Sequence, residues 1–336
     1  MFLYNKRTLQ KSYMIFVLVS VIIIFGVVFA LQYNPELNVS ELTWRQLRCN
    51  YVASEIMSSH STESRLGNFL FFYSALMYVA SITGRRPCIL RRSIGSTPFD
   101  AVFDHDLVQV DNETLVCRQH KFTEQKFGVY DQRVASLVDT ADDELLVLHG
   151  LFQSWKYVQP IAGQLRDQLR FRRELKEFAS KFLHKSVPLC WNGSKFVRVG
   201  VHVRRGDFIR WPNSWIGYTA ADEHYLRRAM NIFTQRFRRV QFVVTSDDIR
   251  WCQKHIKSNS SGVNITFSVG HSAGEDLALL ASCDHTVMTT GTFSWWAAWL
   301  ANGITIYYAN FPKRFSWLSI GMQLQDYYHP NWTGLV

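Results

Sequence analysis

The chain has 336 residues, of which 47% are apolar and 19% are charged, and its net charge is +10. This composition excludes a disordered chain and is sufficient for a large buried core. The basic balance suits an anionic ligand such as a nucleotide diphosphate. It does not indicate a nucleic-acid-binding surface, because no Lys/Arg run with interleaved aromatic residues and no nucleic-acid motif occurs.

Residues 14–31 carry no charged side chain. At about 1.5 Å per helical residue they span about 27 Å, enough for a thin bilayer. The basic residues near the amino terminus all precede this segment, so the positive-inside rule predicts a cytosolic tail (1–13), a signal-anchor (14–33) and a luminal remainder. The alternative is a cleaved signal peptide, whose apolar region is ordinarily shorter.

Cysteines and glycosylation sequons all follow the predicted anchor, as expected of a luminal body. The even number of cysteines allows several disulfide pairings. Cys252 and Cys283 lie in helix-like, partly apolar segments, where buried free thiols are an alternative. The N-x-S/T sequons begin at Asn38, Asn112, Asn192, Asn259, Asn264 and Asn331.

Residues 34–58 lack a clear period and are predicted to form a stem, and the globular pattern begins near residue 60. An amino-terminal domain is expected over 59–190. Asn68 is expected to cap or lead into an apolar helix. The elements expected in this domain are a helix over 69–82, strands over 87–91 and 145–152, and a helix over 162–184.

Strands and helices alternate regularly in the remaining residues, 191–336, which predicts a parallel Rossmann-like sheet. Ligands of such sheets bind at the carboxyl ends of the strands, so the polar residues that follow each strand are the candidate site residues. The expected strands are 196–205, 240–246, 263–270, 285–290 and 303–309, and the expected helices are 221–237, 247–258, 273–283 and 293–302.

The strand 196–205 contains His202 and ends in Arg204 and Arg205, with Gly206 and Asp207 following. Guanidinium groups bind phosphate oxygens in pairs, and glycine lets a ligand approach the backbone closely. This run predicts a diphosphate site. The alternative is a surface salt bridge between arginine and aspartate.

After the strand 285–290, a glycine and the hydroxyls of Thr292 and Ser294 open a helix. Free N–H groups and the helix dipole make such a helix start an anion site. The alternative is ordinary N-capping by Thr292. The tryptophans of this helix, Trp295, Trp296 and Trp299, are interpreted as packing residues.

Three acidic positions have two interpretations each. Asp276 could accept from the N–H edge of guanine or be solvated. Asp247 and Asp248 could contact a ribose or cap the next helix. Asp104-His105-Asp106 matches the D-x-D of metal-dependent sugar transferases, but it lies outside the sheet pattern, and no metal site is predicted.

The segments VGVHVRRGDF (199–208), FVVTSDDIRWC (242–252) and TTGTFSWWAAWLANG (289–303) resemble successive motifs of galactoside α-1,2-fucosyltransferases. The resemblance covers roughly residues 62–310. It implies a GT-B-like fold of two Rossmann-like domains, with residues 59–190 on the acceptor side and residues 191–336 binding GDP-fucose. It also implies inverting, metal-independent transfer of fucose from this donor. The acceptor would be the 2-hydroxyl of a terminal galactose on a glycan, and the enzyme would be a single-pass type II protein of the Golgi membrane.

The wider group of fucosyltransferases with the H-x-R-R-x-D element implies residue roles as well. Arg204 and Arg205 would hold the diphosphate, with Arg205 also catalytic, and Thr292 and Ser294 would join them. His202 and Asp276 would meet the guanine edge, and Asn68 would line the cleft from the first domain.

The general base does not carry over, because the segment after Asp207 departs from the related pattern near Pro212. The candidates are Asp207 and then Glu223; the alternative is that no strong base exists. Other function classes are a protein O-fucosyltransferase, a sulfotransferase, whose phosphosulfate loop we do not find, and a non-catalytic sugar-nucleotide-binding protein. The residues leave the exact acceptor open.

Overall fold

A computed structural model describes residues 49–54, 65–91, 98–105, 107–111, 117–141, 143–191, 195–258 and 260–336. The chain divides into the units Met1–Cys49 and Asn50–Val336, and the account below concerns the second unit. The predicted tail and anchor lie outside the described residues. Within these residues, Leu66–Thr83 is long and apolar enough to cross a membrane, but 72% of it is buried inside the protein, as in a core helix.

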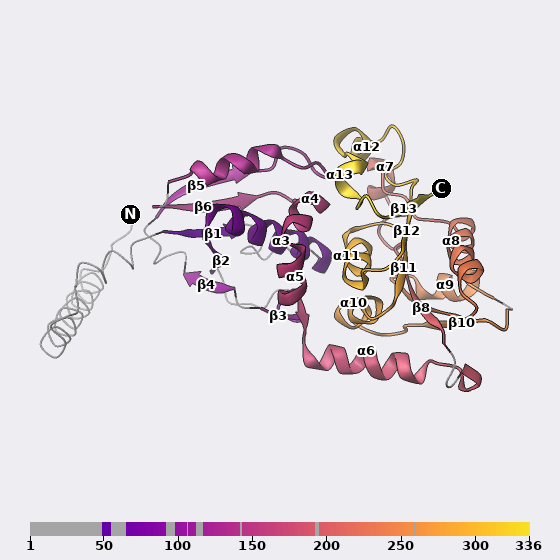
Figure 1. Cartoon of the computed structure of the whole chain (residues 1–336). Coiled ribbons are helices and arrows are strands. Elements are labelled where there is room, and N and C mark those ends of the chain that lie inside the picture. The colour runs from indigo at the N-terminus through magenta and orange to yellow at the C-terminus, as the bar shows by residue number, and fades with distance from the viewer. Residues whose placement is uncertain are drawn as a thin grey trace, which may run out of the picture. The chain divides into compact units, whose positions relative to one another are not determined.

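The first half of this unit contains a five-stranded sheet in which every neighbouring pair is parallel. Its strand order is β4 (Val108–Asp111), β2 (Arg86–Arg91), β1 (Tyr51–Ser54), β6 (Glu144–His149) and β5 (Arg118–Thr123) (Figure 1). Residues 51–54 had been assigned to the stem, yet they form the central strand. Four residues in an aperiodic stretch are too few for a strand pattern to be recognised.

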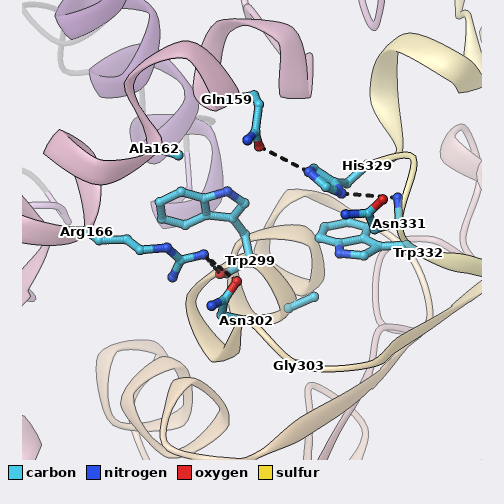
Figure 2. A pocket seen from close by; sticks show the side chains of 10 residues that line it. Gln159, Ala162, Arg166, Trp299, Asn302, Gly303, His329, Asn331 and Trp332 are labelled. Carbon is cyan, nitrogen blue, oxygen red and sulfur yellow. Dashed lines mark hydrogen bonds between the residues drawn. The ribbon is translucent and has the colours of Figure 1, made fainter.

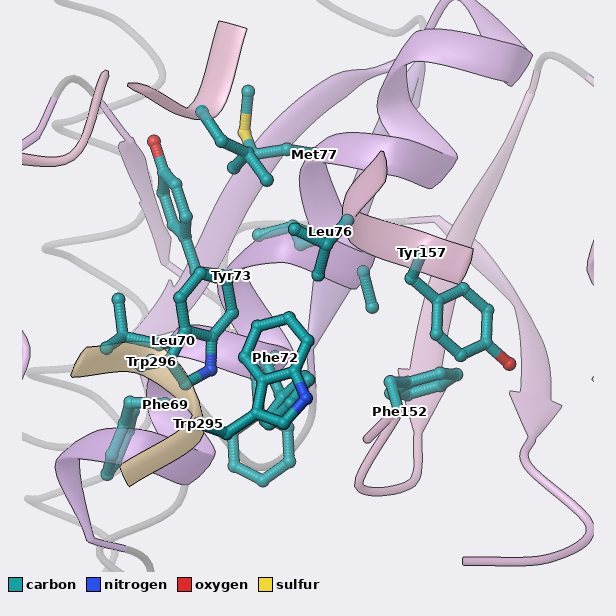
Figure 3. Close-up of a cluster of buried hydrophobic side chains, with 14 of the residues drawn as sticks. Phe69, Leu70, Phe72, Tyr73, Leu76, Met77, Phe152, Tyr157, Trp295 and Trp296 are labelled. Atoms are coloured by element: carbon teal, nitrogen blue, oxygen red, sulfur yellow. The ribbon is translucent and has the colours of Figure 1, made fainter. Parts of the chain in front are cut away.

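Helix α3 (Leu66–Thr83) confirms the helix expected over 69–82 and ends at Gly84 in the left-handed conformation (φ 68°). It is apolar around most of its circumference and is therefore buried on several sides. Figure 3 shows it packed against Trp295 and Trp296 of helix α11 (Thr292–Ala301). The Phe71 ring lies 4.8 Å from that of Trp295 and 5.2 Å from that of Trp296. The predicted packing role of these tryptophans is confirmed.

The second half contains a six-stranded parallel sheet, which confirms the expected alternation of strands and helices. Its order is β10 (Val263–Phe267), β9 (Val240–Ser246), β8 (Val197–Val203), β11 (His285–Met288), β12 (Thr305–Tyr308) and β13 (Thr333–Leu335). The chain moves outward from β8 in one direction and returns to the other side at β11. The switch point therefore lies between β8 and β11, where ligands of such sheets bind.

All four helices expected in this half are present: α8 (Glu223–Arg236), α9 (Ile249–His255), α10 (Ala273–Ala281) and α11. The helix expected over 162–184 is instead two helices, α5 (Ala162–Gln168) and α6 (Arg173–Lys185). Between them β7 (Arg170–Phe171) pairs with β3 (Phe103–Asp104), which breaks the helical period. The other elements are η1 (Gln132–Asp139), α4 (Trp155–Val158), η2 (Gln159–Ile161), η3 (Leu189–Trp191), α7 (Asn213–Ile216), α12 (Trp317–Gly321) and α13 (Leu324–Tyr327).

The cysteines fall into two groups. Cys49 and Cys117 are disulfide-bonded, whereas Cys88, Cys190, Cys252 and Cys283 are free thiols. Cys252 and Cys283 are both buried, which confirms the interpretation of these two residues as buried free thiols.

Candidate functional site

A cleft of about 1360 Å³, including its open mouth, lies at the carboxyl ends of β8 and β11. Residues from the first half and from the second half of the protein line this cleft. Most of the predicted site residues meet here, although they are far apart in the sequence: Asn68, His202, Arg204, Asp207, Asp276 and Thr292.

The amino-terminal ends of α3 and α11 meet at this cleft. A Cβ on Gly67 would lie 2.6 Å from the backbone nitrogen of Phe293, so glycine permits a contact that alanine would block. Asn68 Oδ1 accepts hydrogen bonds from Thr292 Oγ1 at 2.9 Å and from Gln153 Nε2 at 3.1 Å. Neither helix has a side-chain N-cap hydrogen bond. Two positive helix ends therefore face the same cleft.

Arg204 is the arginine that the structure brings to the cleft. Its guanidinium pairs with Asp207 Oδ1 at 2.5 Å and with Asp247 Oδ2 at 3.0 Å, and the side chain is only 18% exposed. A Cβ on Gly206 would lie 2.3 Å from Asp247 Oδ2, so this glycine makes room for the pair. The guanidinium is thus held in one orientation with part of its edge available to a ligand.

Arg205 is directed elsewhere. Its Nε lies 3.4 Å from Asp248 Oδ2, and its guanidinium lies 3.9 Å from the centroid of the Trp251 ring. Arg205 does not line the cleft. Adjacent residues of an extended chain point to opposite sides, so only one of the two arginines reaches the cleft. The structure thus brings Arg204, and not Arg205, to the cleft. Asp248 also accepts from the Trp251 backbone N–H and so caps α9.

The carboxylate of Asp207 lies in the cleft between two guanidinium groups. Oδ1 pairs with Arg204, and Oδ2 lies 3.3 Å from Arg65. Arg65 is not among the residues predicted from the sequence to form the site. The signal for it is its place one residue before α3, at the same helix end as Asn68.

His202 is buried and oriented by Ser294. Ser294 Oγ donates to the Thr290 carbonyl oxygen at 2.9 Å, so it can only accept from His202 Nδ1, 2.5 Å away. Burial lowers the pKa of His202 to about 4, so the ring is neutral at neutral pH. Its Nε2 is consequently a hydrogen-bond acceptor. Ser294 is itself fully buried and does not reach the cleft, so its expected phosphate contact becomes a positioning role.

Asp276 projects from α10 into the same cleft. Ser268 Oγ donates to its Oδ1 at 2.6 Å, and burial raises the pKa of Asp276 to about 6. The carboxyl group is therefore poised to change protonation just below neutral pH.

Glu223 does not reach the cleft. It begins α8, and its carboxylate lies 2.5 Å from His255 Nδ1 and 3.7 Å from Arg227, beside a separate pocket. The hydrogen bond from His255 lowers the pKa of Glu223. Because its partners hold it against α9, we do not retain it as a candidate base.

No group of three or more His, Cys, Asp or Glu side chains within the described residues is arranged to hold a metal ion. Of the D-x-D match, Asp106 lies outside the described residues. His105 Nε2 lies 2.6 Å from Asp100 Oδ1, so its ring is paired within the local turn.

Two sequons lie within the described residues. Asn264 is partly buried on β10, and its Nδ2 donates to the Ser186 carbonyl oxygen at 3.0 Å, which would have to break for a glycan to attach. Asn331 is exposed. The other sequons, at Asn38, Asn112, Asn192 and Asn259, lie outside the described residues.

Figure 2 shows another pocket, at the carboxyl-terminal end of α11. Arg166 donates there to the Trp299 carbonyl oxygen at 3.0 Å and to Asn302 Oδ1 at 2.9 Å, and it lies over the Trp299 ring. This arginine is engaged by the negative end of the helix. A diphosphate would be better placed at the opposite end of α11, in the cleft with Arg204.

Comparison with known proteins gives a consistent result. The family model of glycosyl transferase family 11 matches residues 26–336. Galactoside alpha-(1,2)-fucosyltransferase 1 of Saimiri sciureus is 33% identical over 279 residues, which are 81% of this chain and 73% of that protein. Galactoside 2-alpha-L-fucosyltransferase SEC1 of Bos taurus is 38% identical over 198 residues, or 57% of this chain and 52% of that protein.

The crystal structure of POFUT1 in complex with GDP-fucose aligns with a TM-score of 0.50 at 11% sequence identity, covering 78% of this chain and 99% of that chain. At this identity the likeness concerns the fold alone. Together with the two parallel sheets, it confirms the α/β, GT-B-like part of the predicted fold.

Proposed function

The chain belongs to glycosyl transferase family 11, and from this premise we propose that it transfers fucose from GDP-fucose to the 2-hydroxyl of a terminal β-galactose. The main support for the proposal is the arrangement of positive groups in the cleft. Arg204 and the amino-terminal ends of α3 and α11 supply positive charge to one place, at the switch point of the second sheet. The relatives named for galactoside fucosyl transfer supply the donor and acceptor classes.

The diphosphate and the guanine of GDP-fucose would each find complementary hydrogen-bonding groups in the cleft. The diphosphate would accept from the Arg204 guanidinium and from the backbone N–H of Thr292 at the start of α11. The guanine N–H edge is a row of donors, and the ionised carboxylate of Asp276 and the neutral His202 Nε2 are acceptors. Asn68 lines the cleft from the first half of the chain, where the resemblance to fucosyltransferases placed it.

In the proposed reaction, the acceptor oxygen forms a bond to the fucose anomeric carbon while the bond from that carbon to the β-phosphate oxygen breaks. The hydroxyl proton passes to a base, for which Asp207 is our candidate, and GDP leaves with the bonding electron pair. Arg204 stabilises the negative charge that grows on the β-phosphate. A side chain of this protein therefore supplies the positive charge that a metal ion supplies in metal-dependent sugar transferases. We expect no metal requirement.

We further propose that the protein is anchored in the Golgi membrane through residues 14–33, with the cleft in the lumen. The support is the uncharged segment and the basic residues that precede it. The disulfide-bonded Cys49 and Cys117 fit an oxidising compartment.

The test uses the full-length chain in detergent with GDP-fucose, a chelator and N-acetyllactosamine. We expect a fucosylated product whose α-1,2 linkage is established by NMR. The matched control is the same disaccharide with a 2-deoxygalactose, which should accept no fucose. Transfer to the deoxy acceptor, or a requirement for added metal, would contradict the proposal.

The affinity for GDP-fucose should depend on pH through Asp276. The carboxylate accepts the guanine N–H groups and the protonated acid does not, so the donor binds the deprotonated form. Affinity should be full above pH 7 and should fall about tenfold per pH unit below the pKa of about 6. Calorimetric titration with GDP-fucose checks this.

GDP-fucose is preferable to GDP here, because a terminal phosphate itself titrates near pH 6. Asp276→Asn should bind more weakly, with an affinity that is flat over the same range. A variant that kept the wild-type pH profile would assign the titration to a group other than Asp276.

A further inference from the structure

A groove beside the cleft is lined almost wholly by aromatic and aliphatic side chains. It encloses about 700 Å³ of open space, and its residues are Phe127, Trp215, Ile216, Trp317, Leu318 and Gly321. Trp215 is 67% exposed and Trp317 is 74% exposed. Large apolar side chains that gather on an open groove commonly mark a binding surface.

The groove is continuous with the cleft. Phe127 lines both. Two chain segments also run from one to the other: Trp215 lies in the groove and Tyr218 in the cleft, while Trp317 lies in the groove and Phe311 in the cleft. A ligand that fills the groove can therefore extend to the reacting atoms.

The walls of the groove are fixed to one another at their base. The Lys313 backbone N–H donates to the Gly217 carbonyl oxygen at 2.9 Å, and that of Gln323 donates to the Gly128 carbonyl oxygen at 3.2 Å. Gly217 has a φ of 123°, and a Cβ there would lie 2.1 Å from Ser316 Oγ. The exposed tryptophans thus stand on a connected backbone frame, which lowers the entropy lost when a ligand binds.

The chemistry of the lining selects an amphipathic, uncharged ligand. The groove has no charged side chain, unlike the cleft, so it does not suit a second nucleotide. Each tryptophan offers a broad apolar face and an indole N–H that can donate. A pyranose ring has an apolar C–H face and hydroxyl groups at its edge, which match those two features.

We propose that this groove is the acceptor subsite, in which Trp215 and Trp317 pack on the saccharide units adjoining the reacting galactose. The proposal rests on the proposed function and adds where the acceptor binds. The expected occupant is a neutral oligosaccharide. Trp215 and Trp317 from the second half and Phe127 from the first half would contact the sugars beyond galactose, whereas the sequence predicts the acceptor side in the first domain.

The test measures steady-state kinetics of the full-length chain with N-acetyllactosamine for Trp215→Ala and Trp317→Ala. We expect the KM for the acceptor to rise about tenfold or more, as when an aromatic anchor is truncated. The KM for GDP-fucose should stay unchanged. The matched control is Trp211→Ala, because Trp211 is 81% exposed on the same segment but does not line the groove.

An unchanged acceptor KM in both groove variants would overturn the proposal, as would an equal rise in the Trp211→Ala control. A membrane surface is the competing occupant. A raised KM for a galactose-terminated glycolipid in vesicles, with an unchanged KM for the soluble disaccharide, would assign the groove to lipid and overturn the saccharide. Absence of any transfer by the wild-type protein would instead count against the proposed function.

Discussion

Arg204→Ala should reduce turnover by about 100- to 1000-fold, since removal of one preorganised donor to a developing negative charge costs about 2.7–4 kcal/mol. Arg204 is the guanidinium in the cleft, held by Asp207 and Asp247. Its removal also leaves those two carboxylates without their shared cation, and they would then repel the diphosphate. Steady-state kinetics with GDP-fucose and N-acetyllactosamine check the result.

Arg205→Ala is the matched control, because the adjacent residue has the same chemistry and a different direction. Its guanidinium contacts Asp248 and Trp251 on the side of α9. We expect a fall of about tenfold or less, through looser positioning of the run that carries Arg204. If Arg205→Ala were inactive while correctly folded, and Arg204→Ala kept most of its activity, the assignment of the diphosphate contact would be wrong.

Gly67→Ala should lower both stability and activity. The added methyl group would meet the α11 backbone at 2.6 Å, and the backbone of a helix start cannot yield as a flexible side chain can. Overpacking of this kind costs about 1–3 kcal/mol and should lower the Tm by several degrees. The two helix ends would also separate, and a displacement of about 1 Å at a reacting centre can reduce turnover about 100-fold.

The control for this prediction is Gly163→Ala. Gly163 lies in helix α5, and a Cβ there would have no heavy atom within 4 Å. Alanine in that helix should leave the Tm unchanged or raise it slightly. Equal effects of the two substitutions on Tm and turnover would show that close contact of α3 with α11 is not what requires Gly67.

The alternating strands and helices of the second half were predictable because each strand is a short apolar run followed by an amphipathic or apolar helix. The order of the sheet then places His202 and Met288, from β8 and β11, side by side, which is why strand-end residues identified separately meet in one cleft. The first half was less predictable. Strand β1 is four residues long, and β5 exposes most of its side chains, so neither has an apolar period.

The directions of the side chains at the site were also not predictable from the sequence. The sequence does not distinguish Arg204 from Arg205. The extended chain directs the two side chains to opposite sides, and the paired acids after β9 hold Arg204 toward the cleft and Arg205 toward α9. Ser294 likewise looks like a phosphate ligand at a helix start, whereas it is buried and accepts a hydrogen bond from His202 Nδ1. The groove residues Trp215 and Trp317 carry no periodic signal, because they stand on two short helices joined by tertiary contacts.

The most direct test of the central claim is a crystal structure of the protein with GDP bound. The β-phosphate should lie within hydrogen-bonding distance of Arg204 and of the start of α11 at Thr292, with the guanine edge facing Asp276 and His202. GDP bound in the pocket at the other end of α11, or in the cleft with its phosphates against Arg205 instead of Arg204, would contradict this account.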